Sequence, residues 1–369
     1  METAAVHAGR PIAPSSGVSD PISGWISALR EGNADERAIF EGLEKFILVD
    51  RTQVLMGVAE CISLFNQEEL DTTKTTRLVQ KVFECADSEI RDLRSRVCLL
   101  RCLNGISRKY HSEKSNRFVA LTLSDLLCSD EELGAEDYQV LLGAGGRLVS
   151  SHTADVSNLW NSIFKTDVCS LSSRGLSHFV LVLGAVSPRG KVPTHETMLS
   201  RLAERIRDCD GSQDLVPLLL GLGEVSLTEG ALPFQRDFLR LTSRYRTPPY
   251  ETQGDFVVVE TILHFIRGIG WNSLSKSERN ELLGSLKKLW DGLAIRLRPG
   301  CGSLCYRVIC LLGNTSFGDA DLKGLDIIPF LSLVTFDVIA DVRSWPNILD
   351  HLEKIGCKVR SPVVSLDAT

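Results

Sequence analysis

The 369-residue chain has few aromatic residues, no excess of positive charge and no long hydrophobic run. Apolar residues never continue for about 18 positions without a charged or helix-breaking residue, so we expect no segment to cross a membrane as a helix. The 41 Lys and Arg are outnumbered by 47 Asp and Glu, and the net charge of −6 lacks the basic balance typical of nucleic-acid-binding proteins. A hydrophobic share of 43% and a charged share of 24% exclude extended disorder and indicate a folded protein.

The sequence also contains no CxxC pair. Its 11 cysteines are odd in number and lie mostly in apolar stretches, which is typical of buried, reduced cysteines rather than of a disulfide framework. Cys98 and Cys102, like Cys301 and Cys305, are four residues apart and would share one face of a helix. No further ligands stand near either pair, so we predict no bound metal.

Motifs for nucleotide binding and hydrolysis are missing as well. GxxxxGK[ST], GxSxG and HExxH do not occur. Residues 143–146, with the sequence GAGG, superficially resemble a dinucleotide-binding loop, but no strand is predicted before them, which favours close helix packing. The histidines are scattered, and His264 lies in an apolar helix, where we expect a core or groove residue. We therefore predict that the protein is not an enzyme and binds no cofactor.

Helical periodicity runs through most of the chain. Apolar residues recur at i, i+3 or i+4, and i+7, and Gly, Pro, Asn, Asp and Ser separate the segments. Strand-like alternation with hairpin turns does not occur, and the valines at 257–259 are too short a run to support a sheet. We predict an all-α fold with helices over residues 21–30, 35–49, 53–65, 75–86, 92–109, 113–127, 136–149, 156–165, 174–186, 196–208, 213–225, 232–244, 255–269, 277–297 and 304–312, with a final pair between 327 and 355.

Every second predicted helix carries an aliphatic pair followed by small residues. One anchor position for each motif gives 55, 100, 142, 182, 220, 263 and 310. Steps of about 38–47 residues match two helices and two short loops, the length of HEAT and armadillo repeats. The recurring Gly and Ala would let the inner helices of adjacent hairpins approach closely. We predict a right-handed α-solenoid of about seven degenerate, HEAT/armadillo-like hairpins; the alternative is a non-repetitive all-α bundle.

These hairpins, with their aliphatic pairs, small residues and Arg-rich flanks, make most of the chain resemble the degenerate helical repeats of organellar RNA-metabolism proteins, the octotricopeptide and FAST-kinase-like arrays. Two features depart from that group. Its members often end in a small α/β RAP domain, whereas residues 338–345 are too short and too helical for one, and the repeat length here drifts more than in a base-reading array. No nucleotide-specifying residue is therefore carried over.

Three parts are expected along the chain: a flexible N-terminal segment over residues 1–19, an α-helical repeat array over 20–357 and a C-terminal tail over 358–369. The N-terminal segment has no apolar core of a secretory signal, and its single arginine makes it a poor mitochondrial presequence.

Arginine outnumbers lysine by 28 to 13, and its planar guanidinium suits phosphates and bases. Basic patches lie over residues 92–117, 201–207 and 233–246. In the last of these, arginines at i, i+4 and i+8 would form a ladder along one helix edge that follows a phosphate backbone, with a tyrosine available to stack on a base. The predicted nucleic-acid-binding residues are Arg201, Arg205, Arg236, Arg240, Arg244, Tyr245 and Arg246. The alternatives are a solvated face paired with carboxylates of the neighbouring helix, an acidic protein partner, and simple codon bias.

These observations lead to the prediction of a non-catalytic scaffold. The preferred function is that of a subunit of an organellar, mitochondrial RNA-processing or ribonucleoprotein complex, which binds other protein subunits and RNA along its groove. The alternative is a HEAT/armadillo-type protein–protein adaptor without nucleic-acid contact, and a cytoplasmic location is the alternative compartment.

Overall fold

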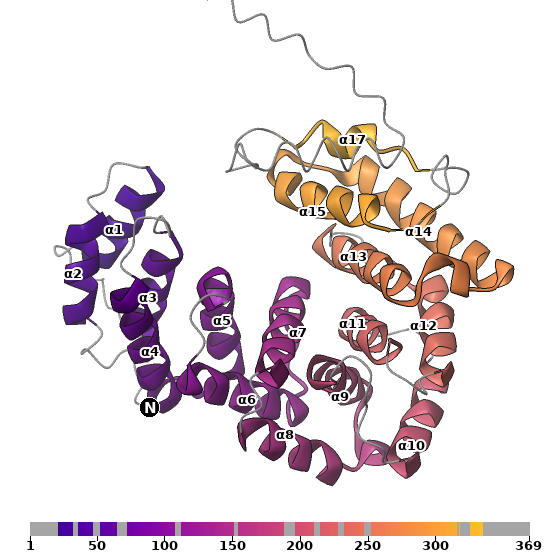
Figure 1. The fold of residues 1–369 in the computed structure, drawn as a ribbon, viewed down its shortest axis with the longest axis horizontal. Helices are drawn as coiled ribbons and strands as arrows, with labels where there is room; N and C mark the ends of the chain where they lie inside the picture. The colour runs from indigo at the N-terminus through magenta and orange to yellow at the C-terminus, as the bar shows by residue number, and fades with distance from the viewer. Residues whose placement is uncertain are drawn as a thin grey trace, which may run out of the picture. The chain divides into compact units, whose positions relative to one another are not determined.

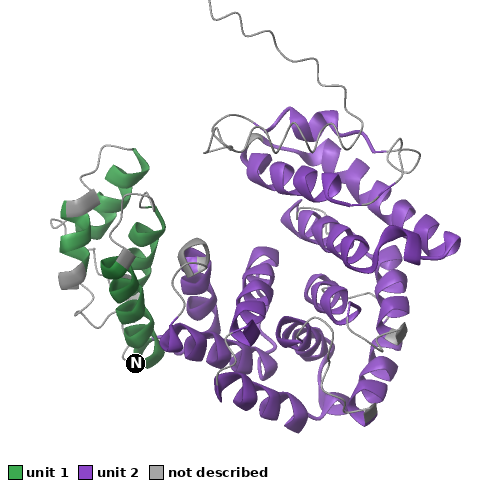
Figure 2. Ribbon diagram, in the orientation of Figure 1, with its two compact units in different colours: residues 1–89 green, residues 90–369 purple. Residues whose placement is uncertain are grey.

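The computed structural model describes residues 21–31, 36–46, 52–64, 72–107, 112–150, 154–187, 196–209, 215–227, 232–246, 252–315, 317 and 325–334. Within these ranges the chain is all-helical and contains no strand (Figure 1). None of the described helices is both long enough and apolar enough to span a bilayer. The chain divides into two compact units, Met1–Glu89 and Ile90–Thr369 (Figure 2). The predicted terminal parts, residues 1–19 and 358–369, lie outside the described residues.

In its described residues the first unit has four helices, of which α3 contacts the other three. Small residues allow this packing. A Cβ atom added to Gly57 of α3 would lie 2.6 Å from Cγ2 of Ile22 in α1, and one added to Gly42 of α2 would lie 2.6 Å from the Trp25 ring. The helices are α1 (Pro21–Arg30), α2 (Glu36–Phe46), α3 (Thr52–Leu64) and α4 (Thr72–Glu89).

The second unit contains helices that alternate between two rows. The inner row is α5 (Leu93–Ser107), α7 (Ala135–Ser150), α9 (Ser173–Val186), α11 (Val216–Val225), α13 (Thr252–Ile269) and α15 (Gly302–Gly313), and each member contacts the next. The outer row is α6 (Glu113–Leu127), α8 (Ala154–Lys165), the short η1 (Val168–Ser170), α10 (Glu196–Arg207), α12 (Leu232–Arg244) and α14 (Lys276–Arg296). Figure 1 shows the outer row lying outside the inner one. Two further short helices, η2 (Trp271–Ser273) and η3 (Pro299–Cys301), flank α14, and α17 (Ile328–Leu331) contacts α15.

The core of this unit lies in the inner row. In α9 every residue from Gly175 to Val186 is buried, and α13 is buried continuously from Gly254 to Leu263. A helix that is apolar on all sides requires neighbours on all sides. The inner helices have them, because α9 and α11 contact members of both rows.

Glycines permit the closest approach within the inner row. A Cβ atom on Gly184 of α9 would lie 2.6 Å from the carbonyl oxygen of Gly221 in α11, and a Cβ on Gly221 would overlap the backbone of Val180. Gly145 of α7 meets Ala185 of α9 in the same way. The prediction that small residues let the inner helices come together is confirmed at these positions.

The predicted helices agree with the observed ones to within a few residues at most ends, and all seven anchor positions fall in alternate helices, α3 to α15. The valines at 257–259 lie in α13, and residues 143–146 lie inside α7. Of the predicted final pair, only α17 lies within the described residues. The prediction for the cysteines was wrong in part: of the ten that are described, only Cys61 and Cys305 are buried, six are partly exposed, and Cys128 and Cys169 are exposed.

Candidate functional site

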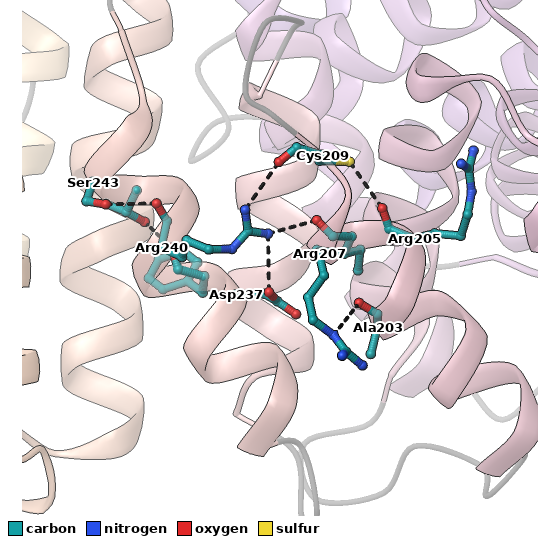
Figure 3. A network of polar contacts seen from close by, with 10 residues as sticks. Ala203, Arg205, Arg207, Cys209, Asp237, Arg240 and Ser243 are labelled. Carbon is teal, nitrogen blue, oxygen red and sulfur yellow. Dashed lines mark hydrogen bonds and ion pairs between the residues drawn. The ribbon is translucent and has the colours of Figure 1, made fainter.

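Three of the predicted nucleic-acid-binding arginines donate to backbone carbonyl groups. Arg246 reaches those of Ser243 (3.4 Å) and Tyr245 (3.3 Å) beside it, whereas Arg205 and Arg240 reach those of another element. Arg205 of α10 donates from Nη2 to the Leu171 carbonyl oxygen, at the end of η1, over 2.8 Å. Arg240 of α12 donates to the carbonyl oxygens of Ile206 (2.8 Å) and Cys209 (3.2 Å), at the end of α10 (Figure 3). The last carbonyls of a helix have no partner within the helix, and a guanidinium group satisfies them well. Arg205 therefore connects α10 to η1, and Arg240 connects α12 to α10, so each links two successive members of the outer row.

This arrangement interrupts the predicted ladder. Arg236 and Arg244 are exposed, but Arg240 between them is turned towards α10 and also contacts the Asp237 carboxylate at 3.2 Å. Tyr245 is 5% exposed, so its ring is not presented for stacking on a base. Arg201 and Arg246 are exposed. Nucleic-acid contact by the exposed arginines stays a prediction.

In the basic patch over residues 92–117, arginines pair with carboxylates of neighbouring elements. Arg96 contacts Asp125 at 3.2 Å and donates to the carbonyl of Ile90, while Arg101 contacts Asp137 at 3.2 Å. Arg94 lies 3.5 Å from Glu131. At these three arginines the observed contacts fit the alternative of a face paired with carboxylates, rather than a basic face available to nucleic acid.

A hollow in the second unit lies among the inner helices. It is a groove of about 820 Å³ whose wall takes residues from α7, α9, α11, α13 and α15. Small residues line it, among them Gly143 and Gly146 of α7, which are exposed, and a Cβ on Gly146 would meet nothing within 4 Å. The polar wall includes Arg147, Glu224 and the exposed His264.

The wall of this groove includes a buried carboxylate, that of Glu260 on α13. The Glu260 side chain is only 4% exposed, and its Oε2 accepts hydrogen bonds from Gln139 Nε2 and Arg307 Nη2, both at 2.6 Å. Arg307 also donates to Gln139 Oε1 at 3.1 Å. Burial raises the pKa of Glu260 above its usual value, against the opposing influence of Arg307 and Gln139, and nearby Glu136 adds to the rise.

Glu260, Gln139 and Arg307 were not among the residues predicted from the sequence. One signal was present, because Glu260 interrupts an apolar run from residue 256 to 263, and a charge inside such a run requires a partner. The partners themselves carried no signal. Gln139 precedes Glu260 by 121 residues and Arg307 follows it by 47, so only the tertiary fold brings them together.

Comparison with known proteins found no matching family model and no matching curated sequence. Within the described ranges, no group of three or more His, Cys, Asp or Glu side chains is placed to hold a metal ion. The groove offers hydrogen-bond donors and acceptors on an apolar, small-residue surface, an arrangement suited to binding.

Proposed function

We propose that the chain is a non-catalytic scaffold, a right-handed α-solenoid of degenerate helical hairpins that holds a segment of a partner protein in its inner groove. The observation that carries the proposal is the groove itself, to which five alternate helices, α7 to α15, each contribute wall residues. Alternation of inner and outer helices, with anchor motifs on the inner ones, supports the repeat architecture.

The chemistry of the groove favours a protein segment over RNA. Glu224 and Glu260 line it, and Arg307 is already bound to Glu260. A phosphate backbone brought into the groove would meet two carboxylates and two guanidinium groups, of which that of Arg307 is already bound to Glu260, whereas affinity for nucleic acids depends on an excess of available cations. Of the two predicted functions, the protein–protein adaptor is therefore the one we propose. Membership of an organellar complex stays a prediction.

Filling the groove tests this proposal. Gly146→Trp places a large side chain in the groove, and Gly284→Trp places the same side chain on the exposed face of α14, where a Cβ also meets nothing within 4 Å. The immobilised full-length variants would be incubated with extract of the native source, with and without ribonuclease. We expect a stoichiometric protein that survives ribonuclease, binds the wild type and the Gly284→Trp control, and is lost with Gly146→Trp.

Two outcomes would contradict the proposal. Loss of the bound protein on ribonuclease treatment would make RNA the ligand and would direct attention to Arg201, Arg236, Arg244 and Arg246. Equal recovery on both tryptophan variants would place the binding surface outside the groove.

A further inference from the structure

One oxygen of the buried Glu260 carboxylate has no hydrogen-bond partner among the described residues. Both of the donors that reach this side chain, from Gln139 and Arg307, go to Oε2. Oε1 is buried and accepts none from the described part of the chain. Buried carboxylate oxygens are normally satisfied, and an unmatched one indicates that a donor belongs there.

The position of Glu260 indicates where that donor comes from. The residue lies on the wall of the groove, where Gln139 and Arg307 bond to each other and both donate to its Oε2, and the groove of about 820 Å³ has room for a long side chain. The missing group must be a hydrogen-bond donor, since a carboxylate oxygen accepts. A phosphate oxygen or a carboxylate of a partner cannot fulfil this role.

The charges around the groove favour a cation. Glu224 and Glu260 line it and Glu136 lies close enough to Glu260 to interact with it electrostatically, while Arg147 and Arg307 are the cations on the wall. Three carboxylates, two on the wall and Glu136 beside it, are therefore accompanied by two guanidinium groups, and Arg307 is 48% exposed, so it screens the charge of Glu260 incompletely. An added ammonium or guanidinium group balances the set and supplies the N–H donor.

We infer that the groove receives a lysine or arginine side chain of the partner segment, whose N–H group donates to Oε1 of Glu260. The inference depends on the proposed function, because it names the chemistry of the partner that occupies the same groove. It assigns Glu260 the role of the specificity-determining residue, with Gln139 and Arg307 holding its other oxygen in place.

The test uses a library of random 12-residue peptides displayed on phage and selected on the full-length protein. We expect the enriched peptides to share a Lys or Arg at one position and to be lost on Gly146→Trp but retained on Gly284→Trp. On Glu260→Gln, the preference for Lys or Arg should disappear while the other enriched positions remain. Glu281→Gln, which removes an exposed charge on α14, should leave the preference unchanged.

A second measurement keeps the test independent of how well Glu260→Gln folds. The best peptide would be synthesised with its Lys or Arg and with norleucine in its place. We expect the replacement to weaken binding to the wild type by about tenfold or more and, in a double-mutant cycle, to change binding to Glu260→Gln by no more than about twofold.

The outcomes separate the two levels of the proposal. If no enriched peptide is lost on Gly146→Trp, the proposed function itself is wrong. If peptides bind in the groove but the norleucine version binds the wild type equally well, the groove binds protein while Glu260 is satisfied by water, and the inference alone is wrong. Displacement of the peptide by a single-stranded polyuridylate oligonucleotide would make RNA the competing occupant and would overturn both.

Discussion

Glycines of the inner row lie at two kinds of position with opposite consequences for packing. At the seam, defined here as the contact of α9 and α11 through Gly184 and Gly221, each glycine faces the backbone of the other helix. On the groove face of α7, defined by Gly143 and Gly146, the glycines are exposed, and no neighbouring helix backbone lies within 4 Å of where their Cβ atoms would be.

One sequence signal, glycine in an inner helix, therefore accompanies both close packing and open space. At the seam, the missing side chain brings two helices together and removes space. On the groove face, it leaves the space open that the proposed partner segment would occupy. Glycine in a helix interior costs about 1 kcal/mol relative to alanine, so at Gly146 the cost has no compensation from packing and is consistent with a role in binding.

The largest expected effect is at the seam. In Gly221→Ala the new methyl group would overlap the carbonyl of Val180 and lie 2.6 Å from the amide nitrogen of Leu181, so the two helices must separate. We expect the free energy of unfolding to fall by about 3 kcal/mol. Chemical denaturation followed by circular dichroism measures it. An unchanged midpoint would show that the seam is not packed as described.

A smaller loss of stability is expected in the outer row, where Arg240 is bound to the neighbouring helix and Arg244 is exposed. Arg240→Ala leaves the carbonyls of Ile206 and Cys209 without their donor and should cost about 1–2 kcal/mol in the free energy of unfolding. Arg244→Ala removes an exposed guanidinium group and serves as the matched control, with an expected change within about 0.5 kcal/mol. Equal losses would remove the distinction between the two positions.

A pH dependence is expected from a buried histidine on the side of α9 that contacts Tyr138 of α7. His178 of α9 is fully buried between Tyr138 and the Ser129 carbonyl, and burial is the main cause that lowers its pKa from the usual 6.5. Below pH 6.5 the unfolded chain takes up a proton that the folded chain still excludes. The contribution of His178 to the free energy of unfolding is therefore fully present above pH 6.5. It declines as the pH falls towards the folded-state pKa, by at most about 1.4 kcal/mol per pH unit.

Urea unfolding of the wild type and of His178→Gln at several pH values between 4.5 and 8 measures this contribution. The wild type should lose more stability on acidification than the variant does. Parallel pH profiles would mean that His178 takes up a proton equally well in the folded and unfolded chains.

The smallest effect is expected on the groove face, and its sign is reversed. Gly146→Ala adds a methyl group in open space within α7 and improves helix propensity, so the free energy of unfolding should rise by about 0.5–1 kcal/mol. A thermal or denaturant midpoint that falls would indicate that Gly146 contacts another part of the chain.

Much of the fold could be predicted from the sequence, because helix positions depend on residues close to one another in the chain. Periodic apolar residues placed the helices, and the anchor motifs separated inner from outer helices. The sequence could not distinguish Gly145, which packs against Ala185, from its neighbour Gly146, which lies open, because that difference depends on which helix lies opposite. The boundary between Glu89 and Ile90 likewise depends on contacts rather than on a linker composition.

The candidate site was harder to predict from the sequence than the fold. Helical spacing correctly put Arg236, Arg240 and Arg244 on one face of α12, but it carries no information about the ends of α10 that Arg240 meets. The groove carboxylate was missed for a related reason: Glu260 is recognisable as an interruption of an apolar run, whereas its partners come from α7 and α15 and are brought to it only by packing of the inner row.

The central claim is that the inner groove binds a partner segment, and the most direct test is the affinity of the best selected peptide for the two tryptophan variants, measured by fluorescence anisotropy. Gly146→Trp should weaken binding by about tenfold or more, while Gly284→Trp should match the wild type. Equal affinities for Gly146→Trp and the wild type would contradict the account.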